Sequence, residues 1–281
     1  MTTYLLAFDH RDSLMTAFFE TAEPSKTEVA SARSLKTLIA DGLLAAIGRS
    51  RVDRKEAGGL VDATYGGIAI DKLRTRGVRF AVPVEASGMR EFEFEHADWR
   101  QRLDAIRPTW AKVLVRYNPA GDAEMNARQR ERLLELQAGT RELRVGFLFE
   151  LLVPPEPDQR DADFDTATRP GLVVQAIEEL RGAGIQPDLW KIEGFELRAD
   201  CEAVAAVAGA PCVVLGRGAD AAAVETWLRA AAGVFDGFAI GRSIWWEPCQ
   251  AFVAGSMERD AAVSAIADRY GHFVDVYRSG F

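Results

Sequence analysis

Cysteine and histidine are scarce in this sequence, with three residues of each among 281. Cys201, Cys212 and Cys249 have no metal-ligand spacing and cannot all pair with one another, so we expect reduced thiols. The histidines do not cluster either. We therefore predict neither a metal site nor a bound cofactor.

An excess of positive charge is also missing, since 34 Lys and Arg residues against 42 Asp and Glu residues leave a net charge of −8. This excludes a global basic field that would attract nucleic acid or an anionic membrane. The longest apolar run, Ala203 to Leu215, is interrupted by Gly209 and Pro211 and falls short of a membrane span. The first residues carry no basic segment typical of a signal peptide. We expect a cytoplasmic protein without nucleic-acid or membrane partners.

The sequence does contain an alternation of short apolar runs with longer helical patterns. Eight runs have the length of strands: Tyr4–Phe8, Gly59–Asp62, Val78–Val84, Ala111–Tyr117, Val145–Leu152, Leu189–Ile192, Cys212–Leu215 and Gly237–Ile240. Helical patterns between them include Glu28–Ile47, Asp98–Ile106, Asn126–Leu136, Gly171–Gly182, Ala199–Val207 and Ala221–Ala232.

This alternation predicts a parallel sheet, and eight such units predict one α/β domain over residues 1–281, a single (β/α)8 TIM barrel. The alternative is a doubly wound open sheet, which usually has a glycine-rich phosphate loop after its first strand. Asp9-His10-Arg11-Asp12 occupies that position here. The least regular stretch, Pro154–Pro170, is interpreted as a long loop after the fifth strand, either a mobile lid or a plain surface loop.

Charged residues inside the strands can be assigned to a face, because side chains alternate along a strand and helices cover the outside of a barrel. The assignment sends Asp9, Lys112, Glu150 and Lys191, from four different strands, into one interior. Catalytic residues of such barrels lie at the carboxyl ends of the strands, where most of these residues fall. Any one of them alone can also be a structural charge that is paired inside the barrel.

Lys191 lies in the apolar strand Leu189-Trp190-Lys191-Ile192, which is flanked by proline and glycine. A buried ammonium group is unfavourable, and a lysine near another cation has a lowered pKa that lets it attack a ketone and form a Schiff base. Lys112 is the expected second cation, and the carboxylates are expected to move protons. The alternative is a Lys191 side chain that points outward along a helix surface.

Two glycine and arginine motifs follow the last two predicted strands. They are Gly216-Arg217-Gly218 and Gly241-Arg242-Ser243. The seventh and eighth loops of these barrels commonly bind phosphate, because glycine admits backbone N–H groups and arginine adds charge-assisted hydrogen bonds. We predict direct contacts from Gly218, Gly241 and Arg242, and include Arg217 and Gly216 in the same phosphate-binding site.

Three further residues are weaker candidates for substrate contacts. Asp62, after the second strand, is predicted either to cap a loop, to orient a lysine or to bind substrate hydroxyls. Arg116 is predicted either to receive a substrate carboxylate or to balance Glu150. His10 is a candidate polar contact, and Glu85 has no assigned role.

The chain resembles the class I aldolases of the tagatose 1,6-bisphosphate aldolase type. It is more similar still to the aldolase-like domain joined to 5-dehydro-2-deoxygluconokinase in inositol catabolism. The motifs that carry the resemblance are Phe8-Asp9-His10-Arg11-Asp12-Ser13-Leu14, Val61-Asp62-Ala63-Thr64-Tyr65-Gly66, Lys112-Val113-Leu114-Val115-Arg116-Tyr117, Phe149-Glu150-Leu151-Leu152, Trp190-Lys191-Ile192-Glu193 and Gly241-Arg242. By motif position, the resemblance implies that Lys191 forms the Schiff base and that Lys112 is the second active-site lysine. It also implies that Glu150 and Asp9 are the carboxylates and that Gly241-Arg242 binds phosphate.

The resemblance also implies a substrate, a small sugar phosphate cleaved without a metal. The expected reaction converts 5-dehydro-2-deoxygluconate 6-phosphate to dihydroxyacetone phosphate and malonate semialdehyde, with Arg116 as a candidate for the carboxylate end. The sequence departs from the tagatose enzymes at His10, where they carry glutamine, and at Gly216-Arg217-Gly218, where they carry a Ser-Ala-Gly turn. Tagatose bisphosphate, a sulfo-sugar phosphate and a non-catalytic sugar-phosphate-binding barrel remain alternatives, and the oligomeric state stays open, a homo-oligomer included.

Overall fold

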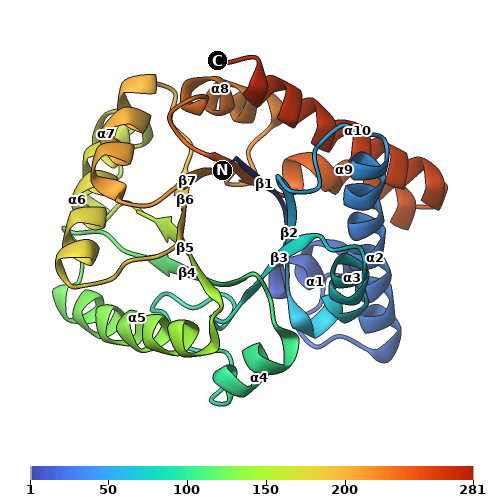
Figure 1. Cartoon of the computed structure of the whole chain (residues 1–281), viewed down its shortest axis with the longest axis horizontal. Helices are drawn as coiled ribbons and strands as arrows, with labels where there is room; N and C mark the ends of the chain where they lie inside the picture. The colour runs from blue at the N-terminus through green and yellow to red at the C-terminus, as the bar shows by residue number, and fades with distance from the viewer. Residues whose placement is uncertain (1, 281) are drawn as a thin grey trace.

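Eight parallel strands close into a barrel in the order of the sequence, as Figure 1 shows along the barrel axis. The computed structural model describes residues 2–280. The strands are β1 (Thr3–Phe8), β2 (Ala57–Val61), β3 (Arg79–Pro83), β4 (Trp110–Arg116), β5 (Gly146–Leu152), β6 (Leu189–Glu193), β7 (Cys212–Leu215) and β8 (Gly237–Ile240). The predicted (β/α)8 TIM barrel is therefore confirmed, and each of the eight predicted strands is present with ends within two residues.

Helices surround the barrel on its outer side (Figure 1). They are α1 (Asp12–Phe19), α2 (Lys26–Gly48), α3 (Ala63–Thr75), α4 (Trp99–Ile106), α5 (Ala123–Leu143), α6 (Arg169–Gly182), α7 (Arg198–Ala208), α8 (Ala221–Ala231), α9 (Arg242–Val253) and α10 (Arg259–Arg278). The predicted helix Asn126–Leu136 is the middle of α5, which continues past Gly139. A Cβ atom at Gly139 would overlap the ring of Trp99, so glycine there lets α4 pack closely against α5.

The strands divide their side chains between two separate apolar layers. Leu5 and Ala7 of β1 face the barrel interior, whereas Tyr4, Leu6 and Phe8 pack in the larger core between sheet and helices. The interior layer is completed by Leu60, Ala81, Leu148, Leu189, Val213 and Ala239. This confirms the faces assigned from the alternation in β1, because successive side chains of a strand point to opposite sides.

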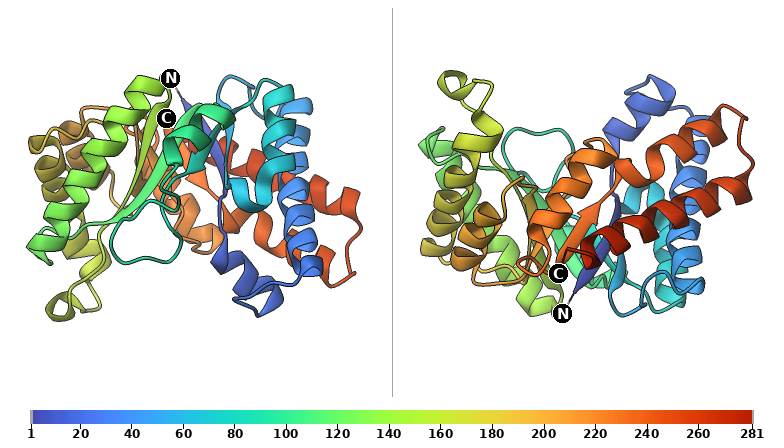
Figure 2. Two further views of the ribbon diagram at one scale, coloured as in Figure 1. Left: turned by 90° about the horizontal axis from the view of Figure 1, so that it is seen from below. Right: turned by 90° about the horizontal axis from the view of Figure 1, so that it is seen from above.

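Both views of Figure 2 place the start of β1 and the end of α10 at one end of the barrel. The long connections after β3 and β5 project at the other end, where the strands finish. The connection between β5 and α6 contains a 3₁₀ turn, η1 (Pro157–Gln159), and a π-helical turn, η2 (Phe164–Thr168). The predicted loop at Pro154–Pro170 is thus present, although its second half is helical.

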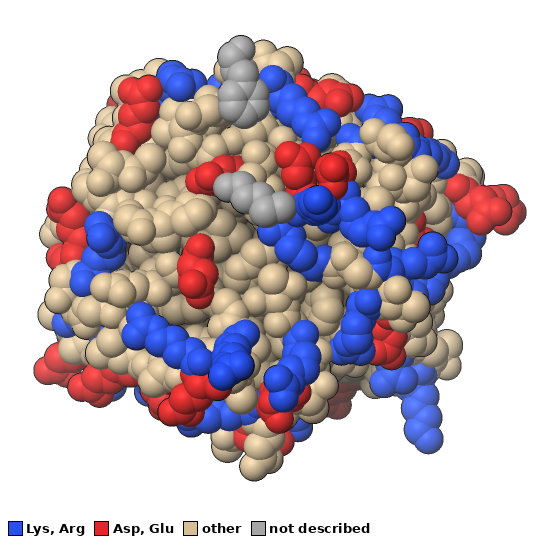
Figure 3. Space-filling view, viewed as in Figure 1, with Lys and Arg blue, Asp and Glu red and all other residues tan. Residues whose placement is uncertain are grey.

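Acidic and basic side chains are interspersed on the face of the molecule seen in Figure 3. This fits a composition in which both signs are frequent. No helix within residues 2–280 combines the length and the apolar character needed to cross a bilayer. Cys201, Cys212 and Cys249 are buried and free, as expected.

Candidate functional site

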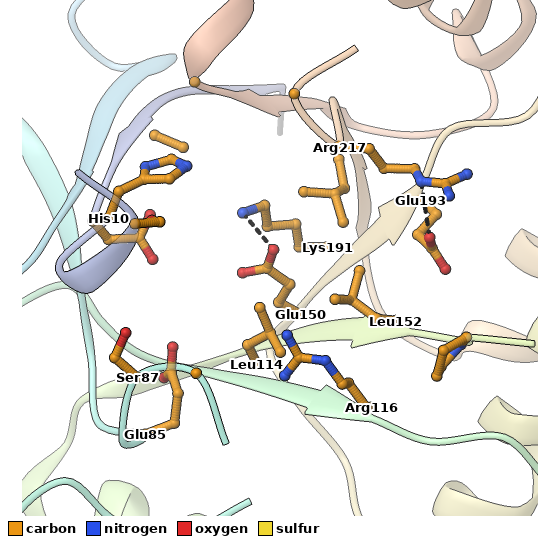
Figure 4. Close-up of a pocket in the computed structure, with 18 of the residues that line it drawn as sticks. His10, Glu85, Ser87, Leu114, Arg116, Glu150, Leu152, Lys191, Glu193 and Arg217 are labelled. Atoms are coloured by element: carbon orange, nitrogen blue, oxygen red, sulfur yellow. Dashed lines mark ion pairs between the residues drawn. The ribbon is translucent and has the colours of Figure 1, made fainter. Parts of the chain in front are cut away.

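The carboxyl ends of the strands surround a cavity of about 560 Å³, a size typical of small-molecule sites. Nearly all residues singled out in the sequence line it: Asp9, His10, Lys112, Arg116, Glu150, Lys191, Gly216, Arg217, Gly218, Gly241 and Arg242. Asp62 does not line it. Figure 4 shows the centre of this cavity, with Lys191 and Glu150 adjacent.

Glu150 bridges two lysines at the centre of the cavity. Its Oε1 lies 2.9 Å from Nζ of Lys191, and its Oε2 lies 2.8 Å from Nζ of Lys112. The backbone explains the first contact, because Glu150 and Lys191 are paired in the register between β5 and β6. Neighbours in register on parallel strands project to the same side of the sheet. All three side chains are buried.

Lys112 contacts two further carboxylates. Its Nζ lies 3.0 Å from Oδ2 of Asp9 and 2.7 Å from Oε1 of Glu85. Burial alone would lower the pKa of Lys112, but Asp9, Glu150 and Glu85 outweigh burial and raise the pKa well above its ordinary value. Lys112 therefore stays protonated, with three carboxylates around its ammonium group.

The three carboxylates titrate differently, although burial acts to raise the pKa of each. Burial raises the pKa of Asp9, but the neighbouring Lys112 and Lys191 overcome this and hold the pKa below its ordinary value. Burial also raises the pKa of Glu150, but Lys112 and Lys191 again outweigh burial and lower the pKa. For Glu85 burial prevails over Lys112 and Arg11, and the pKa is raised. Glu85 is thus the carboxyl in this cluster that retains a proton most readily.

Glu85 was left without a role by the sequence. Glu85 lies beyond the end of β3, so the alternation of side chains along a strand assigns it to no face. Its ion pair with Lys112 forms because the ends of β3 and β4 lie close together. The buried Arg11 holds this segment by donating to the carbonyl oxygen of Glu85 at 2.7 Å. The sequence feature that could have identified Glu85 as a site residue is its position at the carboxyl end of a predicted strand.

His10 lies beside the cluster with its ring edge-on to Trp245, at 5.4 Å between ring centroids. Burial lowers the pKa of His10 to about 4, although Asp9 opposes the shift. The imidazole is therefore neutral at pH 7. Its Nδ1 is buried and has no hydrogen-bond partner among residues 2–280.

A buried lysine that the sequence analysis missed holds the end of β1. Lys36 of α2 donates to the carbonyl oxygens of Phe8 and His10 and forms an ion pair with Oδ2 of Asp62 at 2.7 Å. Asp62 also caps α3 by accepting from the backbone N–H of Tyr65 at 2.7 Å. Asp62 thus caps a helix and orients a lysine outside the cavity, and the predicted contact with substrate hydroxyls does not fit this position. The sequence feature that could have identified Lys36 as a buried lysine is its position on the apolar face of a predicted helix.

The loops after β7 and β8 meet at the edge of the cavity. Arg242 donates from Nη2 to the carbonyl oxygen of Arg217 at 3.2 Å, and its guanidinium lies against Gly218. A Cβ atom at Gly218 would overlap this guanidinium, and the φ angle of +73° also favours glycine. The helix α9 begins at Arg242, so its free N–H groups lie beside the same loops. The two predicted motifs therefore form one candidate anion site.

Arg217 has carboxylate partners of its own. Its side chain lies 3.1 Å from Asp165 of η2 and 3.2 Å from Glu193 at the end of β6. Asp165 also pairs with Arg169 at 3.0 Å. These contacts tie the loop after β5 to the end of β6. Arg217 thus occupies the predicted position, but its charge is shared with two carboxylates.

Arg116 does not balance Glu150, contrary to one of the two predicted roles. The cationic partners of Glu150 are Lys112 and Lys191, and Arg116 donates from Nη1 to the carbonyl oxygen of Met89 at 2.8 Å. Arg116 nevertheless lines the cavity. No group of three His, Cys, Asp or Glu side chains within residues 2–280 is arranged to hold a metal ion.

Residues 2–280 match the model of a family described as uncharacterized proteins conserved in bacteria, DUF2090. The chain belongs to this family. No curated protein matches the sequence. The DUF2090 match spans the whole barrel and includes every residue of the cavity described above.

Several solved structures share the fold of this DUF2090 protein. Cgl0159 from Corynebacterium glutamicum is 17% identical, with a TM-score of 0.61 over 97% of this chain and 85% of the other. A fructose-bisphosphate aldolase from Plasmodium falciparum is 12% identical, with a TM-score of 0.68 over 98% and 90%. An archaeal fructose-1,6-bisphosphate aldolase, whose catalytic lysine is covalently bound to the carbinolamine intermediate, is 15% identical, with a TM-score of 0.60 over 96% and 94%. These likenesses show a common barrel fold.

Proposed function

We propose that this chain is a class I, Schiff-base-forming aldolase, a carbon–carbon lyase that acts on a sugar phosphate. The observation that carries the proposal is the position of Lys191, whose amine lies 2.9 Å from the carboxylate of Glu150 in a cavity at the carboxyl ends of the strands. A lysine nucleophile beside a carboxylate that moves protons is the arrangement that imine formation requires. The fold shared with the archaeal aldolase whose catalytic lysine is covalently bound to the carbinolamine intermediate agrees with the proposal.

The reaction begins when the neutral amine of Lys191 attacks the substrate ketone. Water leaves, and an iminium ion forms between the lysine nitrogen and the former carbonyl carbon. Glu150 then removes the proton from the hydroxyl group that becomes the aldehyde. The electron pair of the breaking carbon–carbon bond moves to the iminium ion, the aldehyde leaves, and an enamine remains on Lys191. Protonation and hydrolysis of the enamine release the ketone product and restore the amine.

The surrounding charges support these steps. Lys112 holds Glu150 and Asp9 in place, because its Nζ contacts both carboxylates and stays charged. Asp9 faces the cavity and can accept hydrogen bonds from substrate hydroxyls. Lys191, Glu150, Lys112 and Asp9 are therefore the proposed catalytic group.

The phosphate of the substrate binds at the loops after β7 and β8. Arg242 supplies a charge-assisted hydrogen bond, and Gly241 and Gly218 let the phosphate approach backbone N–H groups. Because the phosphate is held away from the carbon–carbon bond that breaks, its binding orients the ketone towards Lys191. The proposed substrate is 5-dehydro-2-deoxygluconate 6-phosphate, which is cleaved to dihydroxyacetone phosphate and malonate semialdehyde.

Borohydride trapping tests the proposed chemistry. The protein is incubated with dihydroxyacetone phosphate and sodium borohydride, and the intact mass and a peptide map are measured. We expect a reduced adduct on Lys191 in the wild type and none at this position in Lys191→Met. A folded protein that binds the phosphate without forming an adduct would instead be a non-catalytic sugar-phosphate-binding barrel. Turnover with tagatose bisphosphate, a sulfo-sugar phosphate and the proposed substrate then identifies the preferred sugar.

A further inference from the structure

The connection between β3 and α4 forms an arm that reaches over the cavity. Its two limbs pair antiparallel, with the N–H of Ala86 donating to the carbonyl oxygen of Glu93 at 2.8 Å and the N–H of Glu95 donating to that of Val84 at 2.9 Å. Its tip contributes Ser87, Gly88, Met89 and Arg90 to the lining of the cavity. The arm therefore has its own backbone hydrogen bonds and belongs to the lining of the cavity.

The backbone on both sides of Arg90 is anchored to neighbouring elements. The carbonyl oxygen of Met89 accepts a hydrogen bond from Arg116 of β4 at 2.8 Å. The carboxylate of Glu91 pairs with Arg128 of α5 at 2.8 Å and also with Arg132. These contacts fix the position from which the side chain of Arg90 projects.

Arg90 itself has no hydrogen-bond or ion-pair partner among the residues that the structure describes, although it lines the cavity. The arginines around it differ, because Arg116, Arg128 and Arg132 each contact an acceptor on the arm. Arg116 uses Nη1 for Met89 and keeps its other N–H groups for a further acceptor. Two guanidinium groups thus lie at the tip of the arm. That of Arg90 is unpaired among the described residues, and that of Arg116, which comes from β4, has used one of its N–H groups.

The arm lies across the barrel from the candidate phosphate site. In a closed barrel of eight strands in sequence order, β3 is opposite β7 and β4 is opposite β8. Arg90 follows β3 and Arg116 ends β4, whereas Gly218 follows β7 and Arg242 follows β8. In Figure 4 the ends of β7 and β8 lie above Lys191, and Arg116 lies below Glu150. A substrate with its phosphate at Arg242 and its ketone at Lys191 directs its far end towards the arm.

We propose that Arg90, together with Arg116, forms a second anion subsite that binds a carboxylate at the end of the substrate remote from the phosphate. A guanidinium fork matches a planar carboxylate, and Arg90 forms no ion pair with residues 2–280. This inference deepens the proposed function and rests on it, because it takes the ketone to lie at Lys191. It makes Arg90 a specificity-determining residue that selects phosphorylated keto acids over ketose phosphates without a carboxylate.

The test compares two sugar phosphates that cannot be cleaved because they have no ketone. These are 6-phosphogluconate, which ends in a carboxylate, and glucitol 6-phosphate, which has a hydroxyl group there. Binding of each is measured by calorimetry to the wild type, to Arg90→Gln and to Arg128→Gln. Arg128 is the control, since it does not line the cavity and Glu91 keeps its ion pair with Arg132 when Arg128 is replaced.

We expect the wild type to bind 6-phosphogluconate about tenfold more tightly than glucitol 6-phosphate, as one charge-assisted interaction implies. Arg90→Gln should reduce this preference to about twofold or less and leave the affinity for glucitol 6-phosphate unchanged. Arg128→Gln should keep the wild-type preference. Equal affinities in the wild type, an unchanged preference in Arg90→Gln, or binding of neither compound would each overturn the subsite.

Borohydride trapping separates this outcome from the fate of the proposed function. An adduct on Lys191 together with an unchanged preference in Arg90→Gln would remove the subsite and leave the aldolase. If Arg90→Gln loses the preference but the wild type forms no adduct on Lys191, the aldolase proposal is rejected. The protein is then one that binds phosphorylated sugar acids.

Discussion

Glu150 and Lys191 are register partners on adjacent strands, and their side chains meet at 2.9 Å in the barrel mouth. The backbone pairing itself therefore brings the proposed nucleophile and the proposed proton acceptor together. Glu150 is also held by Lys112 at 2.8 Å, so it cannot move away from Lys191 without giving up a second ion pair. This relationship makes Glu150 the most informative residue to change after Lys191.

Glu150→Gln should lower kcat of the aldol cleavage by about 10² to 10⁴-fold, because the amide cannot accept the hydroxyl proton. Lys112 keeps Asp9 and Glu85 as partners, so we expect the variant to remain folded. Steady-state kinetics with 5-dehydro-2-deoxygluconate 6-phosphate measure the loss, and the borohydride adduct on Lys191 should still form, more slowly. Wild-type kcat in this variant would exclude Glu150 as the proton acceptor.

Lys36→Met should destabilise the protein by about 3 to 5 kcal/mol, since it leaves the buried Asp62 without its counter-ion. The double variant Lys36→Met/Asp62→Leu should lose less, because both charges are removed and mainly the cap of α3 is missing. Urea unfolding of the wild type and the two variants gives the free energies. A double variant as unstable as Lys36→Met would show that the ion pair is not the dominant contact.

His10 should make the protein less stable in mild acid. Its folded pKa of about 4 lies below the unfolded value, so the unfolded chain binds a proton between about pH 6.5 and pH 4 that the folded chain does not. Stability from this group is therefore complete above about pH 6.5 and falls as the pH decreases towards 4. We expect about 1 to 2 kcal/mol of loss at pH 5. The control is His10→Gln, in which urea unfolding at pH 7.5 and pH 5 should lack this component; an equal loss in both proteins contradicts the prediction.

Asp165→Asn should loosen the loop between β5 and α6, because Asp165 pairs with both Arg217 and Arg169. Trypsin should cleave after the exposed Arg160 about threefold to fivefold faster, the effect of a partly exposed ion pair worth less than about 1 kcal/mol. Asp158→Asn in the same loop is the control, since Asp158 has no such pair among residues 2–280. Equal cleavage rates in the two variants would argue against a tether at Asp165.

Much of the site could be predicted because strand geometry has a period of two. Once Leu5 and Ala7 are placed inside the barrel, Asp9 follows on the same face, and the same reasoning applies to Glu150 and Lys191. The glycine and arginine motifs could be placed because the carboxyl ends of all strands in a parallel barrel lie at one end. These inferences need only local sequence and the type of sheet.

Contacts between an outer helix and a strand end could not be predicted in this way. Lys36 reaches the end of β1 from α2, and its partner Asp62 belongs to the next strand-to-helix connection. The sharing of Arg217 between Asp165 and Glu193 depends on how the long loop after β5 folds back. Neither relationship has a fixed spacing in the sequence, because both depend on the docking of separate elements.

The sequence by itself determined the strands, their inward faces and the charges that meet in the barrel mouth, since each follows from periodicity along one segment. The tertiary structure alone decided which charges are neutralised and which remain free. It surrounds Lys112 with three carboxylates, ties Arg217 to two others and leaves Arg90 without a partner among the described residues. The physical reason is that an ion pair forms within a few ångströms, and such distances between remote segments are set only by packing.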